Sequence, residues 1–136
     1  MARISQDSHG ELTRQLARNP GGTWVTCIGR SMEPTIALGD RVRVEACDRP
    51  RPGDVVLLQS PAGYILHRMI ARLPGTDLLL HIGDSPVCTG PGLARMSRII
   101  GRADLPRRPP GARVIKQSLV RLAAGARDRI ARRIRG

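Results

Sequence analysis

The chain has 136 residues and a formal net charge of +12, a length that accommodates one domain with a substantial core. Its longest apolar runs, V-V-L-L at 55–58 and L-L-L at 78–80, fall far short of the ~20 residues of a membrane-spanning helix, and the first ten residues lack an apolar stretch of signal-peptide type. We therefore expect a cytoplasmic protein. Its core must be largely aliphatic, because Trp24 and Tyr64 are its only large aromatic residues.

The positive charge is concentrated at one end of the chain. Residues 107–136 carry ten Lys or Arg and a single acid, whereas residues 1–106 carry thirteen Arg and ten acids. The body is therefore nearly neutral, and any attraction of acidic partners by net charge belongs to the C-terminal tail.

Residues 1–22 are an N-terminal extension in which 8–18 have the spacing of a short helix, with Leu12 and Leu16 on one face. Residues 23–104 then alternate apolar segments with turns rich in Pro and Gly, as in a β protein. The predicted strands lie at 23–28, 41–46, 55–59, 63–73, 77–82 and 97–103. Short strands with almost no helix between them predict a mainly β domain that is compact, antiparallel and partly barrel-like.

Residues 105–112 are a proline-rich linker, and residues 113–136 have the composition of a basic amphipathic helix. Such a helix can lie on an anionic membrane surface, which would place the protein at the inner face of the membrane. It can equally pack on its own sheet and expose its arginines to water. The residues expected to contact a membrane or partner are Lys116, Arg121, Arg127, Arg132 and Arg133.

The cysteines, Cys27, Cys47 and Cys88, are odd in number and widely spaced. They form no C-x-x-C pair and have no zinc-type spacing with the histidines. We expect reduced thiols that contribute to the core, and neither a metal ion nor another cofactor.

Ser31 follows the first predicted strand in the stretch G-R-S-M-E-P-T-I. One interpretation is structural, because a serine can cap a helical turn that carries a proline such as Pro34 in its first turn. The other is that Ser31 is a nucleophile, which requires a base to take its proton and donors to stabilise an oxyanion.

His67 is a candidate base, because in a strand it would share a face with the apolar residues Ile65, Met69 and Ala71, where burial keeps an imidazole neutral. Composition alone allows His81 as the base equally well. Asp84, in the turn I-G-D-S-P, is a candidate carboxylate to orient the imidazole.

The ordered series G-R-S-M-E-P-T-I-A-L-G-D, R-P-G-D-V-V-L-L, H-R-M-I, I-G-D and R-I-I-G-R-A spans most of residues 23–103. This series resembles the S24/S26 serine peptidases, which include type I signal peptidases and the self-cleaving LexA-like repressors. The histidine of H-R-M-I stands where bacterial type I signal peptidases carry a lysine, as in the signal peptidases of the endoplasmic reticulum, archaea and some Gram-positive bacteria.

The resemblance implies that Ser31 is the nucleophile, His67 the general base and Asp84 the orienting carboxylate. It also places Gly29, Met32 and Pro34 at the oxyanion and substrate-binding positions around Ser31. Since Gly29 has no hydroxyl, the oxyanion hole would depend on backbone N–H groups, above all that of Ser31 itself.

These observations predict a serine endopeptidase of signal-peptidase type, which cleaves an extended peptide or a precursor protein through an acyl-enzyme. A LexA-type regulator is a second interpretation, although 22 N-terminal residues are too few for a DNA-binding domain. A third is a catalytically silent binding module whose Arg-rich tail contacts nucleic acid or an acidic partner. The body lacks the paired aromatic residues that stack on bases, which argues against nucleic acid.

Overall fold

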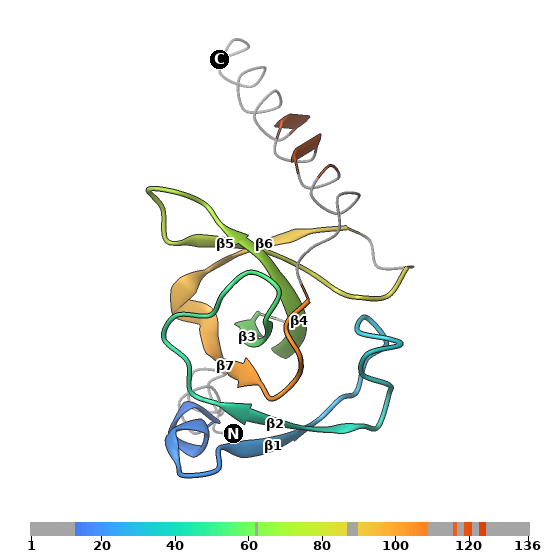
Figure 1. Ribbon diagram of the computed structural model, residues 1–136, viewed down its shortest axis with the longest axis vertical. Helices are drawn as coiled ribbons and strands as arrows, with labels where there is room; N and C mark the ends of the chain where they lie inside the picture. Colours follow the sequence, from blue (N-terminus) through green and yellow to red (C-terminus); the bar gives the residue numbers. More distant parts are fainter. Residues whose placement is uncertain are drawn as a thin grey trace, which may run out of the picture.

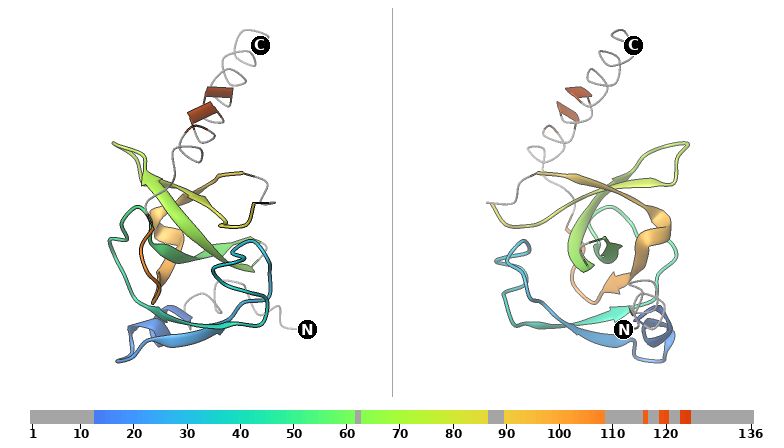
Figure 2. Two further views of the ribbon diagram at one scale, coloured as in Figure 1. Left: turned by 45° about the vertical axis from the view of Figure 1, so that its right-hand side comes forward. Right: turned by 180° about the vertical axis from the view of Figure 1, so that it is seen from behind.

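The computed structural model describes residues 13–61, 63–86 and 90–108, together with 116, 119–120 and 123–124. Within these residues, antiparallel strands form one seven-stranded sheet in the order β1-β2-β7-β3-β4-β5-β6. The strands are β1 (Thr23–Thr26), β2 (Arg41–Glu45), β3 (Val55–Ser60), β4 (Gly63–Arg72), β5 (Leu78–Ile82), β6 (Gly92–Arg95) and β7 (Ile99–Ala103), with the 3₁₀ turn η1 (Met96–Arg98) before β7. The sheet curls into a half-barrel, with β1 and β2 at one end and β5 and β6 at the other (Figures 1 and 2). The prediction of a mainly β, antiparallel domain is confirmed.

The strand β6 is the element that the sequence does not predict. Its four residues, G-L-A-R, follow a G-P pair, and only Leu93 among them is large and apolar. Pairing along the whole of β5, from Leu78 opposite Arg95 to His81 opposite Gly92, outweighs this weak local preference.

The central strand β3 is buried on both faces, which explains its uninterrupted apolar run. Val55 and Leu57 belong to clusters on one face, whereas Val56 and Leu58 pack with Met69 on the other. Because neighbouring residues of a strand point to opposite faces, a strand covered on both sides needs apolar residues at every position.

The short helix before the sheet covers one of these clusters. Residues 13–18 are helical, and Ala17, only 2% exposed, packs with Val44, Leu57 and Ile100. The predicted apolar face is therefore wrong for Leu16, whose side chain is 41% exposed; Leu12 lies outside the described residues. The helix approaches the sheet closely at Ala17, so a small side chain fits at this position.

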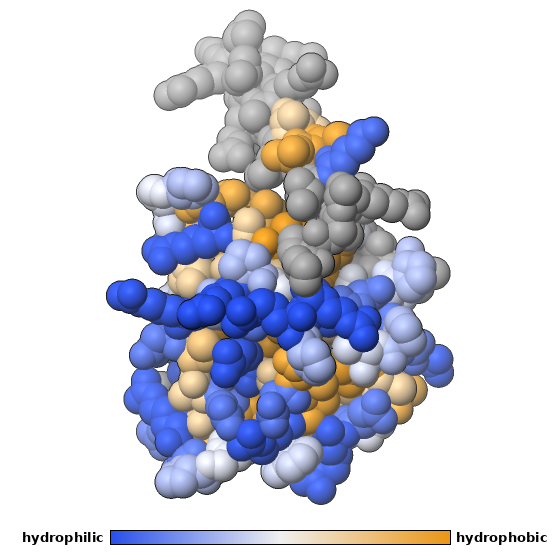
Figure 3. Space-filling view, viewed as in Figure 1, coloured by the Kyte–Doolittle hydropathy of each residue, from blue (hydrophilic) through white to orange (hydrophobic). Residues whose placement is uncertain are grey.

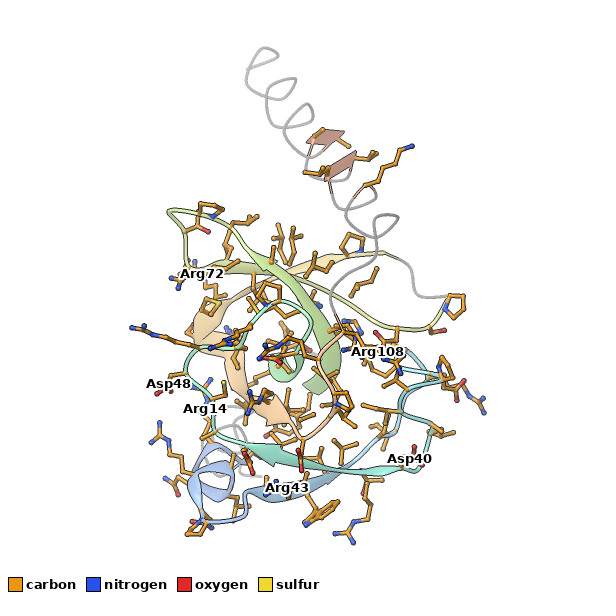
Figure 4. The ribbon with its side chains drawn as sticks, in the orientation of Figure 1. Arg14, Asp40, Arg43, Asp48, Arg72 and Arg108 are labelled. Carbon is orange, nitrogen blue, oxygen red and sulfur yellow. The ribbon has the colours of Figure 1, made fainter. Side chains whose placement is uncertain are left out.

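Residues 105–108, the described part of the predicted linker, run alongside the turn between β2 and β3. Leu105 packs on the core, Arg107 Nε lies 3.0 Å from Asp54 Oδ1, and the Arg108 N–H donates to the Gly53 carbonyl at 3.1 Å. Hydrophilic side chains form a band across the face of the domain that Figure 3 shows. Arg108 lies on the same face (Figure 4). The start of the C-terminal extension is thus fixed to the body.

Few residues of the predicted C-terminal helix are described. Lys116 is helical and exposed, whereas Arg121, Arg127, Arg132 and Arg133 lie outside the described residues. In the described part of the chain, no helix is long and apolar enough to cross a membrane.

The substitution Leu79→Ala should lower the free energy of unfolding by about 2–5 kcal/mol, because it leaves a cavity at a fully buried position of β5. Leu93→Ala, on the neighbouring strand at a position 48% exposed, should change it by less than about 1 kcal/mol. Urea unfolding of the two variants measures this difference, and equal losses would contradict the described core.

Candidate active site

Ser31 lies on the loop between β1 and β2, and its neighbours anchor that loop in the core. Met32 and Ile36 are each 1% exposed and pack with Cys27, while the Ile36 N–H donates to the Met32 carbonyl at 2.9 Å. Residues 31–35 form turns, and the hydrogen-bond partner of Ser31 Oγ is His67 rather than the backbone of these turns. The buried methionine next in the chain instead fixes where the Ser31 side chain stands.

The loop brings Ser31 to His67 on β4, which lies 36 residues further along the chain. Ser31 Oγ is 3.2 Å from His67 Nε2, within hydrogen-bond distance. A serine hydroxyl beside an unprotonated imidazole nitrogen is the arrangement that allows the hydroxyl proton to be removed. The structure therefore brings together two of the three residues that the motifs single out.

This pair borders an apolar pocket of about 450 Å³ between β1 and β4. Gly29 and Met32 line it with Ser31, whereas Pro34 is exposed at the surface of the loop. The other lining residues are Thr13, Val25, Thr26, Cys27, Ile28, Leu57, Tyr64, Ile65, Leu66 and His67. Walls of this kind suit an apolar side chain beside Ser31 Oγ.

The environment of His67 keeps its imidazole neutral. Burial and, to a lesser extent, the neighbouring His81 together lower its pKa from 6.5 to about 4, against a smaller opposing effect of the Asp84 charge. At neutral pH the ring is therefore free to accept a proton at Nε2.

Asp84 does not contact His67; its carboxylate binds Arg68 and Thr35. Arg68 Nε and Nη2 donate to Oδ1 and Oδ2 at 2.8 and 2.7 Å, and Thr35 Oγ1 donates to Oδ2 at 2.6 Å. The strand register explains this placement. Arg68 pairs with Ile82, so Asp84, two residues further on, continues on the face of Arg68, opposite to that of His67.

This Arg68–Asp84–Thr35 cluster fastens the Ser31 loop to β4. Arg68, 5% exposed, also donates from Nη1 to the Gly53 carbonyl at 2.6 Å. Beside the cluster, the Ser85 N–H donates to the Ser31 carbonyl at 2.9 Å. Asp84 therefore affects the position of Ser31 through the backbone of the loop.

The charge of Asp84 is stabilised in this cluster. Burial by itself would raise its pKa, but the hydrogen bonds from Arg68 and Thr35, with the charges of Arg68 and Arg108, lower it below the usual 3.8. The carboxylate is therefore ionised at neutral pH, as a bidentate partner of arginine must be.

The second ring nitrogen of His67 meets His81 on β5 rather than a carboxylate. The two Nδ1 atoms are 2.9 Å apart. His81 pairs with Met69, two residues after His67, so both imidazoles lie on one face of the sheet. His81 and Asp84 are three positions apart, and this odd spacing is the sequence signal that only one of them can reach the face of His67.

A β-bulge in β4 interrupts the apolar face that His67 was expected to share with Ile65, Met69 and Ala71. The pairing of β4 with β5 shifts between Met69 and Ala71, which places Ala71 opposite Leu80 and on the other face. Ile65 and Met69 do share a cluster on the face of His67, so the expectation is wrong only for Ala71.

Neither a family model, nor a curated protein, nor a solved structure matches this chain. Within residues 13–108, apart from the gaps at 62 and 87–89, and at the described positions beyond, no group of three His, Cys, Asp or Glu could hold a metal ion. Cys27 and Cys47 are free thiols, and Cys88 is outside the description.

Replacement of Asp84 by Ala should lower the free energy of unfolding by about 3–5 kcal/mol, because Arg68 would keep a buried charge without its partner. In the wild type this stabilisation is present above pH 3.8 and is lost as the pH falls through the lower pKa of folded Asp84.

Denaturant unfolding at pH 7 measures the effect. The matched control is Asp48→Ala, since Asp48 is exposed and points away from the domain (Figure 4). A loss at Asp84 no larger than at Asp48 would show that the cluster does not hold the loop.

Proposed function

We propose that this protein is a serine endopeptidase of the S24/S26 type, similar to signal peptidases, that cleaves an extended peptide or precursor protein. The observation that carries the proposal is the distance of 3.2 Å between Ser31 Oγ and His67 Nε2 at the edge of an apolar pocket. The motif resemblance supports it independently, since the same two residues are those it marks.

In the proposed reaction, His67 Nε2 accepts the proton of Ser31 as Oγ attacks the peptide carbonyl carbon. The tetrahedral intermediate collapses when the C–N bond breaks and His67 returns the proton to the leaving amine, which leaves an ester on Ser31. Water, deprotonated by the same nitrogen, then hydrolyses the ester. The imidazole thus alternates between base and acid without net change.

The Ser31 N–H is the proposed oxyanion donor. Within the described residues it makes no hydrogen bond, so it remains available to a substrate oxygen. Gly29, which lines the pocket with nothing within 4 Å of its missing Cβ, leaves room for the substrate backbone.

The substrate would bind in an extended conformation. Among the described strands, β1 lies at an edge of the sheet and pairs only with β2, so its other edge would pair with a peptide. Val25, Thr26 and Ile28, on and just after β1, line the pocket beside Ser31 and would contact an apolar side chain near the scissile bond.

Recruitment to an anionic membrane by the C-terminal tail is part of the same proposal. Its support is the concentration of ten Lys or Arg in residues 107–136. Each such charge near an anionic surface contributes about 1 kcal/mol. A cytoplasmic enzyme held at the inner face of the membrane would meet precursors there.

Digestion of a diverse peptide pool, read by mass spectrometry with and without anionic liposomes, tests the activity. Ser31→Ala and His67→Ala should each reduce cleavage by ~1,000-fold or more, because the two residues act as one unit. Ser97→Ala, at an exposed serine before β7, should cleave like the wild type. Cleavage that persists in Ser31→Ala would refute the assignment.

The pH dependence of kcat/KM should follow the pKa of His67. Since the base works in its neutral form, the rate should rise with pH through about 4 and be level at neutral pH. Circular dichroism at each pH separates this titration from unfolding. A midpoint at or above 6.5 would contradict the buried environment of His67.

A further inference from the structure

We infer that His81 is the positioning residue of a Ser31–His67–His81 triad, in which a second imidazole takes the place of the usual carboxylate. The inference rests on the proposed function and deepens it. Its basis is the distance of 2.9 Å between the Nδ1 atoms of His67 and His81, on the side of His67 opposite to Ser31.

The position of His81 is constrained from both neighbouring strands. Its backbone pairs with Met69 on β4 and with Gly92 on β6, and the residue is only 8% exposed. A Cβ atom on Gly92 would lie 2.7 Å from His81 Cε1 and 2.9 Å from Nε2. Only glycine therefore leaves room for the ring, which lies against the backbone of β6.

The Nδ1–Nδ1 contact determines which nitrogens carry protons. Two neutral imidazoles can share one proton in this contact, so one Nδ1 donates and the other accepts. For His67 Nε2 to accept the proton of Ser31, His67 must carry its proton on Nδ1 and donate it to His81 Nδ1. His81 then carries its own proton on Nε2, and it must be neutral to accept.

The surroundings of the two rings favour this neutral state. Burial lowers the pKa of His81 as it does that of His67. The carboxylate whose charge acts on His67 is Asp84, which is held by Arg68 on the opposite face, while the His81 ring lies against uncharged Gly92 of β6. His81 thus remains an acceptor at neutral pH, and it stabilises protonated His67 less than a carboxylate would.

Four variants separate positioning from a merely structural role. His81→Leu removes the acceptor and should lower kcat by ~100-fold or more with little change in KM. His81→Asn places an amide oxygen near the position of Nδ1 and should retain activity within ~10-fold. His81→Asp should also retain activity, but with the midpoint of the pH–rate profile raised, because a carboxylate favours protonated His67. Gly92→Ala should resemble His81→Leu while both histidines are intact.

Nitrogen-15 NMR of the imidazoles at pH 7 tests the inference without relying on peptidase activity. The wild type should show His67 protonated at Nδ1 alone, and His81→Leu should shift the proton to Nε2. A wild-type His67 protonated at Nε2, or equal activity of His81→Leu and wild type, would overturn the triad. The expected NMR result in a protein that cleaves no peptide would instead refute the proposed function and leave the positioning role intact.

Discussion

The buried guanidinium of Arg68 holds together the segments on which the candidate site depends. It binds the carboxylate of Asp84 through two hydrogen bonds and the carbonyl of Gly53 through a third. Asp84 in turn accepts from Thr35, and the adjacent Ser85 N–H holds the Ser31 carbonyl. These bonds fix the position of the β1–β2 loop over β4. The turns within the loop would not fix that position by themselves. Catalysis of the proposed kind requires such a position, because a small displacement of Ser31 Oγ would break its contact with His67.

Side chains alternate between the two faces of the sheet along β4 and β5, so the residues of the candidate site fall into two groups, one on each face. His67 and His81 share one face, where His67 would accept the proton of Ser31 in the proposed reaction, whereas Arg68 and Asp84 share the other face and form the buried ion pair. This separation keeps a full negative charge away from the base. The neutral acceptor on the Nδ1 side of His67 orients its imidazole and leaves it uncharged. A carboxylate bonded to the same nitrogen would instead favour the protonated, charged imidazole.

The sequence predicts six of the seven strands from local signals, and it predicts the Ser31–His67 pair through the motif resemblance. Period-two alternation and Pro/Gly turns mark the strands, and the S-M-x-P-T and H-R stretches mark the pair. The partner of His67 could not be predicted in the same way, since it depends on the register of β4 and β5 and on a bulge next to Met69. The short β6 is formed by pairing with β5 rather than by its own residues, and with it the role of Gly92 stays hidden until the strands are aligned.

The most direct test of the central claim, that His67 activates Ser31, is acylation by a small activated ester such as p-nitrophenyl acetate. The reaction is quenched in acid, and the acetyl group is located by peptide mass spectrometry. The account predicts an acetyl group on Ser31 of the wild type and none on Ser31 of His67→Ala, where the serine is unchanged. Acetylation of Ser31 to the same extent in both proteins, or only at other nucleophiles, would contradict it.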